Sequence, residues 1–131
     1  MITVLFQTES HFPVDRKKVK AAITEVLTSR LTSSAEVSVI IVGDRRMQQL
    51  NLNYRKKDHT TDVLSFPQSD PSQQMAPFVD VPDGVMRLGD IVVSFPEAVR
   101  EATEENKLVD DKIVELVLHG LDHLMGMHHP E

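Results

Sequence analysis

The hydrophobic and polar positions along this chain follow two periods, one typical of strands and one typical of helices. Four short, β-prone apolar runs predict strands at residues 2–6, 37–42, 63–66 and 88–93. The run at 37–42 is nearly continuous, which predicts a strand that is buried on both faces. Apolar residues at helical spacing predict four helices: one after Asp15, one from Asp44 toward Tyr54, one over about 96–106, and one from Asp110 or Asp111 to Gly126. These elements fit a single domain over residues 1–131.

Polar residues and glycine mark the predicted ends of the helices. Asp15 and Asp44 are placed to cap the first two helices, and Ser94 begins a capping-box pattern for the third. Gly126 is expected to adopt the left-handed conformation that ends the last helix. The segment from about 68 to 87 contains three prolines and is predicted to be an irregular loop that flanks a substrate groove.

The composition narrows the chemistry that the chain can perform. It contains no cysteine, so a transition metal would have to be bound by His, Asp or Glu. The net charge of −6 argues against a protein that binds duplex DNA through a broad basic surface. Five basic residues lie between Arg45 and Lys57, and from charge alone they are interpreted as solvent-exposed surface residues. No apolar run is long enough for a membrane span and no signal-peptide pattern is present, which predicts a cytoplasmic protein.

Four of the six histidines fall within the last thirteen residues. His119 and His123 are four residues apart, so on a helix both imidazoles project from one face and can reach one metal ion. Gly126 allows the chain to reverse, which brings a third histidine toward the same face and leaves a fourth position open for water, as in catalytic zinc sites. Adjacent side chains seldom both reach an ion, so only one of His128 and His129 is expected to bind. The alternatives are a non-catalytic zinc site and a chance spacing of solvated histidines.

The run from His119 to His129 resembles the H-G-x-x-H-x-x-G-x-x-H signature of the YbeY family of bacterial endoribonucleases and rRNA maturation factors. Residues 53–67 and 88–94 are similar to two further characteristic stretches of that family, in the same order. The resemblance covers most of the chain, with the first helix and the segment after residue 68 only loosely matched. The chain differs at His128, where the family usually has Asp, and it stops at Glu131, where the family commonly continues into another helix.

The resemblance implies an α+β fold, with a mixed, roughly four-stranded sheet packed by helices and a zincin-like metal-binding helix near the C-terminus. It implies one zinc ion held by His119, His123 and His129, because the six-residue interval after His123 reproduces the family spacing. The implied function is a zinc-dependent endoribonuclease that cuts single-stranded RNA in small-subunit rRNA 3′ end maturation and ribosome quality control. The implied partners are RNA, in particular rRNA of the small ribosomal subunit, and a ribosomal protein, with neither a membrane nor DNA.

Three basic residues near the end of the second predicted helix are the candidate substrate contacts. A guanidinium matches the charged phosphoryl group of a transition state better than an ammonium does, so Arg55 is expected to be catalytic. The resemblance supports this role, since Arg55 falls on the arginine of the family's substrate cleft. Lys56 and Lys57 are expected to hold neighbouring phosphates, while the zinc ion lowers the pKa of bound water from about 16 toward 7. The alternative for Arg55 is a surface ion pair.

The general acid or base is not identified by the sequence. Asp62, Glu115 and Asp122 are carboxylates that could approach the metal, and Asp90 is expected to hydrogen-bond a ligand imidazole or a turn amide. A metalloprotease is the chief rival enzyme, although zincins carry their glutamate base where this chain has Gly120. A rival of another class is a ribosome-assembly factor that uses zinc only for shape.

Overall fold

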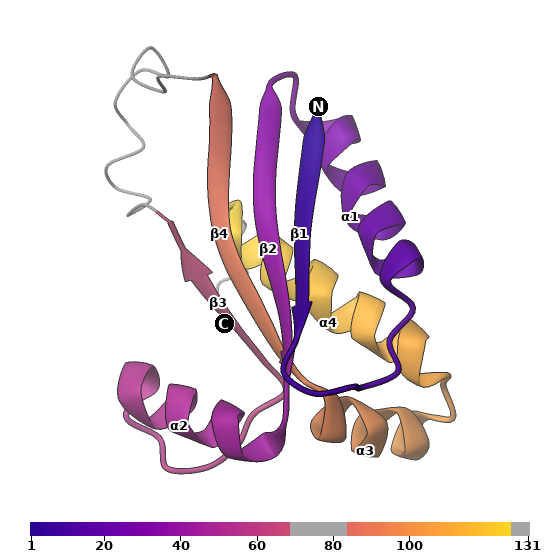
Figure 1. Ribbon diagram of the computed structural model, residues 1–131, viewed down its shortest axis with the longest axis vertical. Coiled ribbons are helices and arrows are strands. Elements are labelled where there is room, and N and C mark those ends of the chain that lie inside the picture. Colours follow the sequence, from indigo (N-terminus) through magenta and orange to yellow (C-terminus); the bar gives the residue numbers. More distant parts are fainter. Residues whose placement is uncertain (69–83, 127–131) are drawn as a thin grey trace.

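The computed structural model describes residues 1–68 and 84–126, which form a four-stranded sheet and four helices (Figure 1). In chain order these are β1 (Ile2–Thr8), α1 (Arg16–Arg30), β2 (Ser34–Val42), α2 (Asp44–Arg55), β3 (Val63–Pro67), β4 (Val85–Ser94), α3 (Phe95–Glu105) and α4 (Val109–Leu124). The predicted α+β class and the four predicted strands and helices are therefore confirmed. None of the helices in these ranges combines the length and the hydrophobicity that a membrane-spanning helix needs.

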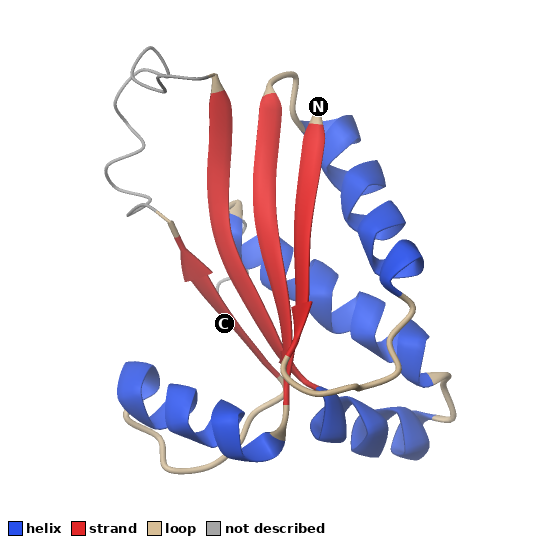
Figure 2. Ribbon diagram, in the orientation of Figure 1, coloured by secondary structure: helices blue, strands red, loops and turns tan. Residues whose placement is uncertain are grey.

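The sheet is mixed, with the strand order β1-β2-β4-β3 (Figure 2). β2 is parallel to β1 on one side and to β4 on the other, whereas β3 is antiparallel to β4. β3 therefore forms one edge of the sheet, and its two faces border different parts of the molecule. β4 begins at Val85, three residues before the predicted strand, because residues 85–87 pair with the start of β2. The rest of the predicted loop, residues 69–83, lies outside the described ranges.

The main core lies on the sheet face that α1 and α4 cover (Figure 1). Alternate residues of the strands point to this face, as the period of two predicts. Its fully buried side chains include Ile23, Leu27, Val37, Val39, Ile41, Ile91, Val93, Ile113, Val117 and Leu121. Each such side chain stabilises the fold by roughly 1.5–3 kcal/mol relative to an exposed one.

The opposite face of the sheet is covered by α2 only near one end. There Met47 packs with Val42, Leu64 and Val92 in a smaller cluster. β2 is consequently buried on both faces only at its last two residues, and along the rest of the strand every second residue is half-buried. The prediction that this strand is buried on both faces is thus wrong for most of its length, because the described helices are distributed unevenly over the two faces.

Two of the predicted helix caps are present, and one is not. Asp15 caps α1 by accepting a hydrogen bond from the Lys18 backbone N–H at 3.1 Å, and Ser94 caps α3 by accepting one from Glu97 N–H at 3.2 Å. The prediction that Asp44 caps α2 is wrong, because Gly43 occupies the N-cap and Asp44 is the first helical residue.

The carboxylate of Asp44 instead joins three parts of the chain. It accepts hydrogen bonds from Ser94 Oγ at 3.0 Å, Thr60 Oγ1 at 3.3 Å and the Arg100 guanidinium at 2.9 Å. Burial raises the pKa of this carboxyl, but the hydrogen bonds from Arg100 and Ser94 outweigh it and leave the pKa below its usual value. The network ties α2 and α3 to the segment that enters β3.

Candidate active site

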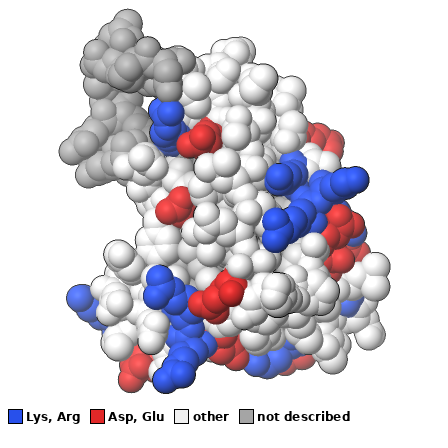
Figure 3. Space-filling view, in the orientation of Figure 1, with Lys and Arg blue, Asp and Glu red and all other residues white. Residues whose placement is uncertain are grey.

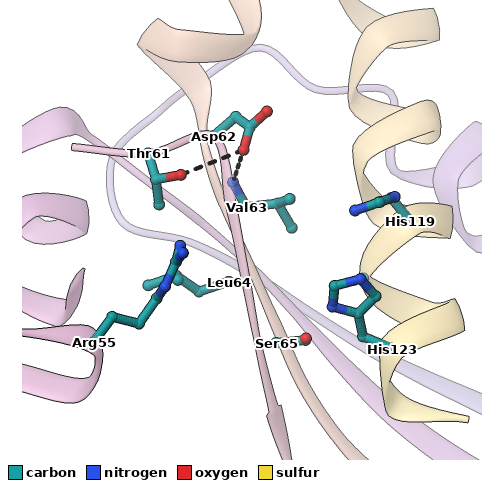
Figure 4. A pocket seen from close by; sticks show the side chains of 9 residues that line it. Arg55, Thr61, Asp62, Val63, Leu64, Ser65, His119 and His123 are labelled. Atoms are coloured by element: carbon teal, nitrogen blue, oxygen red, sulfur yellow. Dashed lines mark hydrogen bonds between the residues drawn. The ribbon is translucent and has the colours of Figure 1, made fainter. Parts of the chain in front are cut away.

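A pocket of about 460 Å³ lies between β3, the C-terminal end of α2 and the helix α4. Its lining residues are Arg55, Thr61, Asp62, Val63, Leu64, Ser65, His119, Gly120 and His123. Figure 4 shows Arg55 reaching toward the pocket from α2 on one side, with the two histidines facing it from α4 on the other and β3 between them. Three of the predicted site residues, Arg55, His119 and His123, are thus brought together from segments that lie more than sixty residues apart in the sequence.

The two histidines share one face of α4. Their ring centroids are 4.7 Å apart with an interplanar angle of 50°, and both residues are exposed. The helix is oriented by its apolar residues, since Val117 and Leu121 are fully buried against the sheet. This orientation leaves the positions at 119 and 123 facing the pocket. α4 ends at Leu124, and Gly126 has a φ of +75°, so the predicted left-handed glycine after this helix is confirmed.

Gly120 sets how closely α4 approaches the sheet. A Cβ atom at this position would lie 2.8 Å from Ile91 Cγ2 and 3.4 Å from Val63 Cγ2. Real carbon atoms do not pack at 2.8 Å, so even alanine would push the helix or the strand aside. The glycine therefore lets the histidine pair lie close beside β3.

Arg55 is positioned by the way α2 ends. Lys56 follows it in the left-handed conformation, with a φ of 59°, and terminates the helix. The fully buried Asn51 then anchors the returning segment, because its Nδ2 donates to the His59 carbonyl at 2.8 Å. Lys56 and Lys57 are exposed and do not line the pocket, so their predicted contacts with neighbouring phosphates would lie outside it.

Of the three carboxylates proposed from the sequence as acid or base, only Asp62 lines the pocket. Glu115 forms ion pairs with Lys107 at 2.6 Å and Lys112 at 2.5 Å, and Asp122 pairs with Arg30 of α1 at 3.0 Å. Asp90 does not face the histidines. It alternates with the core residue Ile91 and lines a different pocket on the other face of the sheet, so the predicted hydrogen bond to a ligand imidazole is wrong for His119 and His123. The alternative role, a hydrogen bond to a turn amide, is not found among residues 1–68 and 84–126.

Asp62 has a partner that the sequence did not suggest. One of its carboxylate oxygens accepts a hydrogen bond from Val63 N–H at 2.7 Å, and the carboxyl also interacts with the Glu101 carboxyl of α3. Burial raises the pKa of Glu101, and the neighbouring Asp62 carboxyl raises it further. The buried Lys112 lies 3.3 Å from Glu101 and opposes this shift. The Glu101 carboxyl therefore retains a proton more readily than an isolated one, next to Asp62 on the pocket wall. No spacing in the sequence links Glu101 to Asp62, and only the packing of α3 joins them.

The described part of the site supplies two of the three expected metal ligands. Within residues 1–68 and 84–126, no three His, Asp or Glu side chains group closely enough to hold a metal ion. His119 and His123 provide a pair of imidazoles in a chain without thiolates, which fits zinc as two members of a three-nitrogen donor set. His128 and His129, the candidates for the third ligand, lie outside the described ranges.

The chain is thus an α+β protein whose candidate active site lies between the edge strand β3 and the helix α4. This chain belongs to the YbeY family, because the family described as Endoribonuclease YbeY matches residues 5–131. It is 36% identical over 113 residues to Endoribonuclease YbeY of Anaeromyxobacter sp. (strain Fw109-5), covering 86% of this chain and 54% of that protein. It is 32% identical over 123 residues to the Endoribonuclease YbeY of Dehalococcoides mccartyi, covering 90% of this chain and 77% of that protein.

The fold is similar to the solution structure of TM1509 from Thermotoga maritima, with a TM-score of 0.62 and 26% sequence identity. That similarity covers 97% of this chain and 75% of the other. The chain spans about half the length of several curated relatives that it matches, 54% in the Anaeromyxobacter protein and 48% in the Rhodopseudomonas palustris protein.

Proposed function

We propose that this chain is a zinc-dependent endoribonuclease that cuts single-stranded RNA. The observation that carries the proposal is the His119 and His123 pair, which faces Arg55 across one pocket. Family membership supports it, since the relatives are named endoribonucleases. The proposed role is 3′ end maturation of small-subunit rRNA and ribosome quality control in the cytoplasm, with rRNA and a ribosomal protein as partners.

The zinc ion would be held by His119, His123 and His129. When bound, it would lower the pKa of a coordinated water toward 7 and so supply a nucleophile at neutral pH. The two described imidazoles are suited to this role because they lie on one helix face and line the same pocket as the proposed substrate contact.

The remaining pocket residues would handle the phosphodiester and its protons. The Arg55 guanidinium binds the phosphoryl oxygens, where negative charge grows in the transition state. Asp62 holds or moves a proton at its carboxylate, and the neighbouring Glu101 carboxyl of α3 positions it. Lys56 and Lys57 bind phosphates of flanking nucleotides outside the pocket.

Metal analysis and RNA cleavage together test the proposed function. The purified chain is expected to hold close to one equivalent of zinc and to cleave a short single-stranded RNA, because the ion supplies the nucleophile. A chelator should abolish cleavage, zinc should restore it, and unfolded casein should remain intact. Less than about half an equivalent of zinc after supplementation, or cleavage that resists the chelator, would contradict the proposal. A chain that binds zinc and RNA without cleaving would instead be a non-catalytic assembly factor.

Substitution of Arg55 tests the proposed contact with the phosphoryl group. Arg55→Ala is expected to reduce RNA cleavage about 100-fold while zinc content and stability stay nearly unchanged, because the side chain is exposed and its role begins in the transition state. Arg55→Lys should restore only part of the loss, since an ammonium lacks the planar pair of donors.

Arg45→Ala is the matched control for this experiment. Arg45 is an exposed arginine of the same helix that does not line the pocket, so its removal changes the net charge equally. Normal RNA cleavage by Arg55→Ala, or an equal loss of cleavage in Arg55→Ala and Arg45→Ala, would show that Arg55 is a solvated surface residue without a specific role in cleavage.

A further inference from the structure

A second pocket, of about 450 Å³, lies on the opposite face of the sheet from the histidines. It is lined by Ile40, Val42, Arg46, Leu50, Tyr54, Phe66, Pro67, Asp90 and Val92. Four of its lining residues are aliphatic, two are aromatic, and two carry opposite charges. A volume of this order lies within the range of small-ligand sites, which are mostly apolar with a few polar groups.

The two aromatic rings form an edge-to-face pair. Tyr54 at the end of α2 and Phe66 of β3 have ring centroids 4.9 Å apart and an interplanar angle of 65°. Tyr54 is nonetheless 66% exposed, which is unusual for an aromatic side chain beside an apolar pocket. An exposed ring held by a second ring is a suitable platform for a planar ligand, and stacking of a nucleobase on such a ring contributes roughly 1–3 kcal/mol.

This pocket lies on the other side of the edge strand β3 from the candidate active site, and neighbouring residues line the two pockets. Tyr54 directly precedes Arg55, and Phe66 directly follows Ser65, while Arg55 and Ser65 line the first pocket. Because side chains alternate along a strand, β3 contributes Val63 and Ser65 to the site of the histidines and Phe66 to the second pocket. Leu64 borders the first pocket and packs in the smaller cluster on the other face. A single-stranded polynucleotide that crosses β3 would therefore meet both pockets.

The two charged lining residues suit a nucleotide. Arg46 offers a guanidinium for a phosphate, and Asp90, which lies opposite Phe66 in the strand register, offers acceptors for an exocyclic amino group. Within the described ranges, no other side chain forms a hydrogen bond or an ion pair with Arg46 or Asp90. Figure 3 shows the Lys and Arg side chains gathered over α2 beside the hollow in the surface.

We propose that this second pocket binds an unpaired nucleobase of the RNA, stacked on Tyr54, while the adjacent phosphodiester lies at Arg55 in the first pocket. The inference rests on the proposed function only in taking RNA as the ligand. It accounts for a single-strand requirement, because a base that is paired and stacked in a duplex cannot enter the pocket. The acceptors of Asp90 favour adenine, guanine or cytosine over uracil, which has no exocyclic amino group.

Tyr54 is the only tyrosine in the chain and there is no tryptophan, so its fluorescence reports on this pocket alone. The experiment titrates the full chain with short single-stranded RNA in the presence of a chelator, which prevents cleavage. Stacking of a base on the ring is expected to quench the emission, with A-, G- or C-containing oligomers binding more tightly than oligo-U. A duplex of the same sequence should leave the emission unchanged.

Substitutions separate stacking from general RNA binding. Measured by anisotropy of a labelled RNA, Tyr54→Ala should weaken binding about tenfold, whereas Tyr54→Phe should retain it because the ring remains. Leu52→Ala is the matched control, since Leu52 is another exposed apolar residue of α2, 42% exposed, that does not line the pocket.

The outcomes distinguish this inference from the proposed function. Quenching without any metal-dependent cleavage would support the base pocket and overturn the proposed endoribonuclease. Cleavage of RNA with unchanged tyrosine emission, or equal RNA binding by Tyr54→Ala and the natural chain, would overturn the base pocket. The second pocket would then be a candidate contact surface for a protein partner. No change in emission or anisotropy at any RNA concentration would overturn both.

Discussion

Replacement of His129 by alanine is expected to abolish RNA cleavage and to lower zinc affinity at least tenfold, whereas His128→Ala should keep the metal and most of the activity. The expectation of a third ligand after Gly126 starts from the end of α4. α4 ends at Leu124 with its two histidines on one face, and Gly126 adopts the left-handed conformation that turns the chain. Two adjacent side chains beyond such a turn point in different directions, so only one of them is expected to reach the ion at roughly 2.0–2.1 Å.

The measurement is a competition between each variant and a chromophoric zinc chelator, followed by a cleavage assay at saturating zinc. The two variants are a matched pair, because each removes one imidazole from neighbouring positions at the same end of the chain. Equal zinc loss in both variants, or zinc loss only in His128→Ala, would show that the assignment of His129 is wrong.

Introduction of a glutamate at position 120, as found in zincin proteases, is expected to destabilise the fold rather than create a protease. The added side chain would have to occupy space already filled by Ile91 and Val63, and its charged group would have to be brought past these apolar side chains. The combined effect is expected to lower the free energy of unfolding by about 4 kcal/mol or more, which is a large part of a typical domain's stability.

Urea denaturation followed by circular dichroism would measure this loss. Gly120→Ala should lower stability by about 1–3 kcal/mol, since one methyl group already crowds Ile91. Ala21→Glu is the control, because it adds the same carboxylate to an exposed position of α1 and should change stability by no more than about 0.5 kcal/mol. A stable Gly120→Glu variant that digests casein would contradict this prediction and support the metalloprotease as the alternative function.

The elements of the fold could be predicted because their signals are local. The spacing of Val19, Ile23 and Leu27 identified a buried helix face, and Ser94 identified the start of α3. The error at Asp44 has a tertiary cause: an acidic residue beside a helix start favours a cap, but here Arg100 and Ser94 bind the carboxylate from other elements. Likewise, an apolar run does not reveal that α2 covers only one end of the second sheet face.

In the candidate site, too, local sequence signals identified some residues, whereas contacts that depend on tertiary packing were missed. His119 and His123 were identifiable from the sequence because a four-residue interval on a helix fixes their proximity. Arg55 was identifiable from its chemistry together with the family resemblance. The contact between Asp62 and Glu101 depends on the packing of α3 near β3, and the second pocket depends on α2 crossing the sheet. Neither relation is encoded in a spacing along the chain.

The place of β4 in the sheet has a consequence for how the protein folds as it is synthesised. In the described ranges β3 pairs only with β4, and β4 also provides the parallel partner of β2. The main core further requires Val117 and Leu121 of α4. Until β4 has left the ribosome, β3 lacks its partner, and until α4 has left it, only α1 covers the apolar face of β1 and β2. The described fold is therefore expected to form only after α4 has been synthesised, with non-local strand pairing as the slow step, and the shorter nascent chain presents surfaces that chaperones recognise.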